Sequence, residues 1–213
     1  MAIGLVGSEM CIRDRDSPLV SNENLTLIGS AEHRSVGRQA VRESVVVLKD
    51  DNVLPISKDL QTLVVAGKGA DNLGMQCGGW SIDWQGGQGD ITIGTTILDG
   101  IKKAVSDSTE IIYSEDGSDV VPNSDNIAVV VIGEDPYTEW FGDKENLDLN
   151  DDDINLINSL KDKGYKVAVL LISGRPMNVA DHIGQWDAFA AIWLPGTEGD
   201  GVSDILFLSL IHI

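Results

Sequence analysis

The chain has 213 residues, of which 42% are hydrophobic and 23% are charged. This length is typical of one domain or slightly more, and the composition is that of a globular chain. Acidic residues outnumber basic ones by 34 to 15, which gives a formal net charge of −19. This charge argues against nucleic acid and against an anionic membrane as partners, because both bind through Lys and Arg. No apolar run reaches the roughly 18 residues that a membrane-spanning helix needs.

The two ends of the chain differ from the sequence between them. Residues 1–15 read MAIGLVGSEMCIRDR and residues 208–213 read LSLIHI, and both resemble translated sequencing-adaptor sequence. We therefore expect both segments to be adaptor scars, and residues 16–29 to be the remnant of a linker. The predicted domain covers residues 30–207, where Cys77 is a lone thiol that we expect to be buried.

Hydrophobic periodicity predicts helices and strands that alternate along the domain. In chain order we expect a helix over 30–44, strands over 45–48 and 62–66, a helix over 95–105, strands over 110–113 and 127–132, a helix over 150–163, a strand over 166–172, a short helix over 176–182 and a strand over 188–194. Continuous apolar strands are typical of a parallel sheet covered on both faces. We therefore predict an α/β fold, a three-layer α/β/α sandwich with a mostly parallel sheet of about five to six strands.

Two predicted connections are much longer than the usual few residues. They cover residues 67–94, which are rich in glycine, and residues 133–149. Both follow strands, so both are expected at the carboxyl edge of the sheet, where open α/β sheets bind ligands. The shorter links 173–175 and 195–199 are expected at the same edge. The sequence therefore predicts a binding site there.

Several familiar chemistries are not supported by the sequence. Gly67-Lys68-Gly69 follows a strand, but Asn72 stands where a dinucleotide site needs its third glycine, so nucleotide binding is disfavoured. There is no Gly-x-Ser-x-Gly nucleophile motif and no metal-ligand spacing. His33 and His182 are expected to be surface or capping residues. We therefore expect no cofactor and no metal.

The glycine-rich stretch over residues 78–87 reads GGWSIDWQGG and holds two tryptophans. A tryptophan in a polar loop offers a flat apolar face that suits a sugar ring, with Asp83 and Gln85 available to the hydroxyls. The alternative is that Trp80 and Trp84 fasten the loop to the body of the domain.

A second informative stretch, residues 133–143, reads GEDPYTEWFGD. Glu139 precedes Trp140 and Phe141, and a carboxyl group held against aromatic surface resists ionisation, as a general acid requires. Glu134 would reinforce this effect if the two carboxyl groups were close. The alternative is a solvated acidic loop.

Five stretches in order resemble one protein family. They are residues 38–55 (RQAVRESVVVLKDDNVLP), 78–86 (GGWSIDWQG), 133–143 (GEDPYTEWFGD), 172–176 (ISGRP) and 193–207 (WLPGTEGDGVSDILF). Together they resemble the C-terminal α/β-sandwich domain of glycoside hydrolase family 3, especially its exo-acting β-glucan glucohydrolase and β-glucosidase branch. The resemblance implies a retaining enzyme that binds a β-glucoside or β-glucan oligosaccharide between this sandwich and an N-terminal (β/α)8 barrel.

The resemblance also implies roles for single residues. The general acid/base would be Glu139, with Glu134 as the alternative. The expected substrate-binding residues are Trp80, Trp84, Gln85 and Tyr137. The nucleophilic aspartate would belong to the barrel, so we expect the chain by itself to be inactive. The resemblance also implies a periplasmic or secreted enzyme. The alternative function is that of a non-catalytic carbohydrate-binding module.

Overall fold

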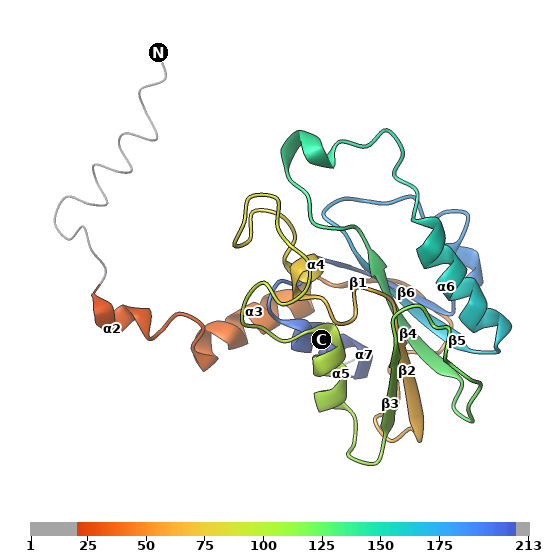
Figure 1. Cartoon of the computed structure of the whole chain (residues 1–213). Coiled ribbons are helices and arrows are strands. Elements are labelled where there is room, and N and C mark those ends of the chain that lie inside the picture. The colour runs from red at the N-terminus through yellow and green to blue at the C-terminus, as the bar shows by residue number, and fades with distance from the viewer. Residues whose placement is uncertain (1–20, 208–213) are drawn as a thin grey trace. The chain divides into compact units, whose positions relative to one another are not determined.

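The computed structural model of the chain describes residues 21–207 (Figure 1). The two predicted adaptor scars lie outside these residues. The described chain divides into two units, one ending at Val36 and the other starting at Gly37. The first unit holds the short helix α2 (Asn22–Leu25), and the boundary falls inside α3 (Ala31–Ser44). The fold and the site described below belong to the second unit.

One six-stranded sheet organises the second unit, in the order β1-β6-β5-β4-β2-β3. The strands are β1 (Val46–Asp50), β2 (Thr62–Ala66), β3 (Glu110–Ser114), β4 (Ile127–Gly133), β5 (Lys166–Ile172) and β6 (Ala188–Trp193). The remaining helices are α4 (Leu73–Cys77), α5 (Ile97–Ala104), α6 (Asp151–Asp162) and α7 (Gly199–Phe207), with 3-10 helices η1 (Glu139–Gly142) and η2 (Ile183–Gln185). All neighbouring strands are parallel except β1 and β6. The predicted α/β fold with a mostly parallel sheet is therefore confirmed.

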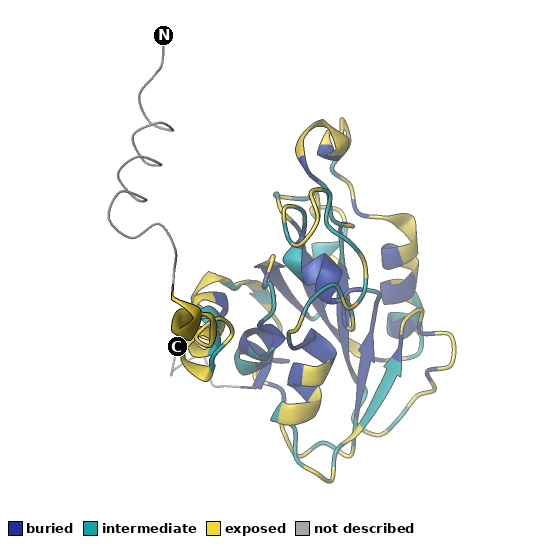
Figure 2. Cartoon of the chain, turned by 60° about the vertical axis from the view of Figure 1, so that its left-hand side comes forward, coloured by how far each residue is buried: buried dark blue, intermediate teal, exposed yellow. Residues whose placement is uncertain are grey.

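The core lies on both faces of this sheet. In β2, Leu63 and Val65 face the layer that contains α5 and α7, whereas Val64 and Ala66 face the layer that contains α6. Figure 1 shows α6 on one side of the strands and α5 with α7 on the other. The inner strands β2, β4, β5 and β6 are buried almost throughout, whereas the edge strands β1 and β3 are partly exposed (Figure 2). Because side chains alternate across a strand, burial of both sets explains why the strands read as continuous apolar runs.

Helix α6 begins where the sequence predicts. The side chain of Asn150 accepts a hydrogen bond from the Asp152 N–H at 3.0 Å. Three aspartates follow in the first turn, where negative charge is stabilised by the helix dipole. The cap and the charges together fix the position at which the chain leaves the loop after β4. None of the helices in the described part of the chain is long and apolar enough to cross a membrane.

The short helix predicted over residues 176–182 is wrong. The Asn178 N–H donates to the Leu147 carbonyl at 2.8 Å, and Asn178 Nδ2 donates to Asp148 Oδ1 at 2.7 Å. In a helix, the backbone groups of this segment would bond to one another. Here Asn178 bonds instead to a separate loop, and the segment is extended. Helix η2 starts only at Ile183. Cys77 also differs from expectation, because it is half-buried, and this burial raises the pKa of its thiol.

Candidate functional site

Two long loops meet above the carboxyl edge of the sheet, one after β2 and one after β4 (Figure 1). The Trp84 ring centroid lies 5.9 Å from that of Trp140 and 5.8 Å from that of Phe141. The Trp80 ring centroid lies 6.4 Å from that of Trp84 on the same loop. We call these four residues the aromatic cluster. The fold therefore brings together the two stretches that the sequence singled out separately.

The aromatic cluster is open to solvent rather than part of the core. Trp80, Trp140 and Phe141 are 69%, 64% and 63% exposed. Trp84 is the least exposed member and contacts all three others by its ring edges or at tilted angles. A contiguous apolar patch on a protein surface is typical of a site that binds another molecule. The cluster therefore presents flat apolar ring faces to solvent.

Unusual backbone conformations concentrate at this edge. Trp80, Ile82, Glu139 and Trp193 have φ values of 61°, 65°, 49° and 53°. Residues with a Cβ rarely adopt such angles, and the cost of about 1 kcal/mol or more is borne only where the surroundings impose it. Such outliers cluster at functional sites, so they support the location of the site at this edge.

Glu134 is a buried ion-pair residue. Its carboxylate accepts hydrogen bonds from Arg175 Nε at 3.1 Å and Nη2 at 2.8 Å, and lies 3.3 Å from Lys144 Nζ. Burial alone would raise the pKa of Glu134, but the hydrogen bonds and charges of Arg175 and Lys144 outweigh it and hold the pKa below its ordinary value. A carboxylate held ionised in this way is a poor proton donor.

Glu139 has the opposite surroundings. It is exposed at the start of η1, next to Trp140 of the aromatic cluster. Among residues 21–207 no side chain or backbone group forms a hydrogen bond or ion pair with its carboxylate. The carboxyl group is therefore free to approach a ligand beside the aromatic cluster.

Gln85 links the two loops. Its Oε1 accepts a hydrogen bond from the Thr138 N–H at 3.3 Å, one residue before Glu139. Its Nε2 and the Thr138 hydroxyl are buried without a hydrogen-bond partner in the described part of the chain. The Gln85 Oε1 atom thus connects the two loops. Binding of a substrate by Gln85 stays a prediction.

Tyr137 lies in the middle of the second loop, under the guanidinium of Arg175. The Arg175 Cζ is 4.2 Å from the ring centroid, and burial raises the pKa of the Tyr137 hydroxyl. Tyr137 and Trp80 both line a pocket of about 220 Å³ with Gly174 and Leu194. The sequence does not single out Arg175 as a functional residue; its signals are its place in the link 173–175 at the predicted binding edge and in the ISGRP stretch.

The loops fit together too closely for side chains at two glycines. A Cβ added at Gly79 would lie 2.2 Å from the Tyr137 carbonyl oxygen, and one at Gly142 would lie 2.2 Å from Tyr137 Cδ2. The first contact is impossible unless the backbone moves, and the second is impossible unless the Tyr137 ring or the backbone moves. The glycines therefore allow the two loops to pack around Tyr137.

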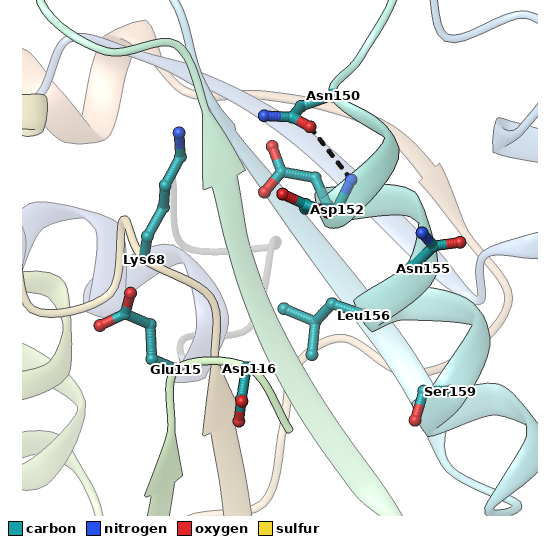
Figure 3. A pocket seen from close by; sticks show the side chains of 9 residues that line it. Lys68, Glu115, Asp116, Asn150, Asp152, Asn155, Leu156 and Ser159 are labelled. Atoms are coloured by element: carbon teal, nitrogen blue, oxygen red, sulfur yellow. Dashed lines mark hydrogen bonds between the residues drawn. The ribbon is translucent and has the colours of Figure 1, made fainter. Parts of the chain in front are cut away.

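A larger pocket of about 430 Å³ lies between the end of β3 and α6 (Figure 3). Lys68, Glu115 and Asp116 line one side, and Asp152 lies on the α6 side. Lys68 is already paired with Asp135 at 2.9 Å. The excess of carboxylates disfavours a phosphate group, in line with the broken glycine pattern after β2. No group of three or more potential metal ligands occurs among the described residues.

Comparison with known proteins identifies the domain. Residues 45–209 match the model of the glycosyl hydrolase family 3 C-terminal domain. A lysosomal β-glucosidase of Dictyostelium discoideum is 30% identical over 81% of this chain and 23% of its own length. A periplasmic β-glucosidase of Salmonella typhimurium is 28% identical over 82% of this chain and 27% of its own. The chain thus spans about a quarter of the length of these relatives.

Solved structures agree with this match. A mutant exo-1,3/1,4-β-glucanase from a Pseudoalteromonas species superimposes with a TM-score of 0.77 and 42% identity, over 84% of this chain and 30% of that protein. A β-glucosidase from Listeria innocua shares the fold, with a TM-score of 0.74 and 23% identity over 93% of this chain and 28% of that protein. The chain belongs to glycosyl hydrolase family 3, and its six-stranded α/β unit is the C-terminal domain of that family.

Proposed function

We propose that this domain supplies the general acid/base and part of the substrate clamp of a retaining, exo-acting β-glucosidase or β-glucan glucohydrolase. The observation that carries the proposal is the contrast between two carboxyl groups on one loop. Glu139 is exposed beside the aromatic cluster, whereas Glu134 is held by Arg175. This contrast favours Glu139 as the acid/base.

The chemistry needs two carboxyl groups about 5 Å apart on opposite sides of the sugar bond. Glu139, when protonated, donates its proton to the leaving glycosidic oxygen while an aspartate attacks the anomeric carbon. Glu139, then ionised, takes a proton from the water that hydrolyses the glycosyl-enzyme. Trp84 and Trp80 stack on the sugar next to the cleaved bond, with Tyr137 and Gln85 completing the clamp.

The nucleophile and the remaining sugar contacts would come from a (β/α)8 barrel in the same protein. The span of this chain, about a quarter of its curated relatives, supports a further domain. The crystal structure of a β-glucosidase mutant from Listeria innocua with laminaribiose supports a β-glucoside or β-glucan oligosaccharide as the substrate class. The periplasmic and lysosomal relatives support an exported enzyme.

We expect the purified chain to release no nitrophenol from a nitrophenyl β-glucoside, because Glu139 alone cannot form the glycosyl-enzyme. Release by the chain at a rate above that of the Glu139→Ala variant would contradict this division of labour. The assignment of Glu139 is tested after the domain is joined to a family 3 barrel. There Glu139→Ala should lower kcat/KM about 10²–10⁴-fold on an alkyl glucoside and far less on a dinitrophenyl glucoside, whose leaving group needs no protonation.

A carbohydrate-binding module is the second candidate, because the aromatic cluster is exposed in the chain as it stands. This function predicts that the chain binds laminari- or cello-oligosaccharides and that Trp84→Ala abolishes binding. Calorimetric titration separates the two functions. The hydrolase domain should bind weakly, because most contacts to the terminal sugar would lie on the barrel.

A further inference from the structure

One arginine contacts the segment that carries Glu139 at its start, its middle and its end. We call residues 134–142 the Glu139 loop. Arg175 donates from Nε and Nη2 to the carboxylate of Glu134, the first residue of the loop. Its Nη1 donates to the carbonyl of Gly142, the last residue, at 2.6 Å. Its guanidinium lies over the ring of Tyr137 at 4.2 Å. Glu139 lies between Tyr137 and Gly142, and so between two of these contacts.

The backbone that leads to Arg175 is bonded to β6 and packs against Tyr137 of the Glu139 loop. It follows β5, where the Ser173 N–H donates to the Trp193 carbonyl at 3.1 Å. Gly174 lies against the Tyr137 hydroxyl, so closely that an added Cβ would be 2.9 Å from its oxygen. The Arg175 side chain is only 21% exposed. The arginine therefore links the end of β5 to the Glu139 loop.

The contacts require an arginine rather than any positive charge. A planar guanidinium can bind a carboxylate through two nitrogens, donate from the third and stack on an aromatic ring. Neutralising Glu134 would need only the first of these. The bond to the Gly142 carbonyl and the stacking on Tyr137 fix the course of the backbone around Glu139, which a simple ion pair would leave unfixed.

Glu139 has no comparable anchor of its own. It adopts φ 49°, is exposed, and its carboxylate forms no hydrogen bond or ion pair with residues 21–207. Its position is therefore set by the residues that flank it. A misplacement of about 1 Å can cost a catalytic group roughly 10²-fold in rate. We propose that Arg175 is a positioning residue that fixes the Glu139 loop in its reactive shape, an inference that rests on the proposed role of Glu139.

The first test uses this chain and needs no activity. Arg175→Lys keeps the charge but cannot make all the contacts, and Glu134→Gln weakens the ion pair while keeping the Gly142 bond. Arg38→Lys is the matched control, because Arg38 binds Asp204 through two bonds of 2.7 and 2.6 Å away from this loop. The readouts are hydrogen exchange over residues 135–143 and the near-ultraviolet circular dichroism of the tryptophans.

We expect Arg175→Lys to raise exchange in the Glu139 loop at least about tenfold and to change the tryptophan signal, with β4 and β5 unaffected. Glu134→Gln should act in the same direction more weakly, and Arg38→Lys should leave the loop unchanged. Unchanged exchange in the loop of Arg175→Lys would overturn the proposal. So would an equal rise throughout the sheet, because that would mean general destabilisation.

The second test uses the domain joined to a family 3 barrel. In Arg175→Lys, loss of positioning should lower kcat/KM, which reports formation of the glycosyl-enzyme, about 10²-fold on an alkyl glucoside, which needs the proton, and less than about tenfold on a dinitrophenyl glucoside, which does not. Equal losses on both substrates would contradict a positioning role for Arg175. If Glu139→Ala shows no difference between the substrates, the proposed function fails instead, while the exchange result on this chain still decides whether Arg175 orders the loop.

Discussion

Glu134 and Glu139 show how strongly tertiary surroundings divide two identical side chains on one loop. Glu134 is buried, paired with Arg175 and Lys144, and its pKa is lowered. Glu139 is exposed beside Trp140. Enzymes that use two carboxyl groups separate their roles through such differences in environment. Here the difference separates a structural carboxylate from a candidate acid/base.

Asp153 is a buried carboxyl at the edge of the candidate site, in a pocket that Glu134 and Arg175 also line. It is 6% exposed in the first turn of α6, and burial raises its pKa from 3.8 to about 6, although the charge of Lys68 and a hydrogen bond with the Gly133 backbone partly oppose the rise. A raised pKa in the folded state means that the native protein binds more protons than the unfolded chain between about pH 4 and 6. Stability therefore falls as the pH rises through this range.

We expect Asp153→Asn to remove this part of the pH dependence. The shift from 3.8 to about 6 corresponds to about 3 kcal/mol at neutral pH, so the variant should be more stable than the parent by up to that amount at pH 7 and by little at pH 4. Denaturant unfolding at both pH values measures the difference. Asp151→Asn, at an exposed residue of the same helical turn, controls for the loss of one negative charge. An equal gain at both pH values would contradict the expectation.

At the scale of elements, the short helix α4 acts through one buried side chain. Gln76 has no exposed surface. Its Nε2 donates to the carbonyls of Thr95 at 3.2 Å and Gly196 at 2.9 Å, and its Oε1 accepts from the Ile97 N–H at 2.9 Å. One amide thus connects α4 to the start of α5 and to the turn between β6 and α7.

Replacing Gln76 by leucine should therefore destabilise the domain by about 3 kcal/mol or more, because buried backbone groups of α5 and of the β6–α7 turn lose their partner. The unfolding midpoint in urea measures this loss. Gln39→Leu is the matched control, because the Gln39 amide forms an exposed bond with Glu43 on the surface of α3. A loss for Gln76→Leu no larger than for the control would show that α4 does not hold these elements together.

At the scale of the whole molecule, a strong negative charge coexists with an exposed apolar patch. The formal charge is −19, and the aromatic cluster is largely open to solvent. Like charges keep molecules apart at low salt, but the screening length falls from about 10 Å at 0.1 M to about 3 Å at 1 M. Once the repulsion is screened, the aromatic cluster becomes the favoured contact between copies.

We accordingly expect the chain to be monomeric at low salt and to self-associate as salt is added, which sedimentation velocity measures. The double variant Trp140→Ser, Phe141→Ser should remain monomeric in the same series. Ile93→Ser is the control, since Ile93 is 89% exposed but does not belong to the aromatic cluster. Association of the double variant at the same salt concentration as the parent would place the contact elsewhere.

The sequence predicts the strands well because their signal is local. Thr62–Ala66 and Lys166–Ile172 have the predicted bounds, since a short run of mostly apolar residues is enough to indicate a buried strand. It does not predict α4 or α7, and it predicts a helix over residues 176–182 that is absent. Helix α4 is five residues long, and the extended segment depends on bonds to Leu147 and Asp148 from a distant loop.

The sequence by itself determined the α/β class, the mostly parallel sheet, the family and the two stretches that form the candidate site. These depend on periodicity and on residue order, which a linear pattern records. Only the tertiary structure decided that Trp84 meets Trp140 and Phe141, that Arg175 binds Glu134, and that Glu139 stands exposed. These outcomes depend on side chains from separate loops meeting at one sheet edge, where burial and charge are set by neighbours far away in the chain.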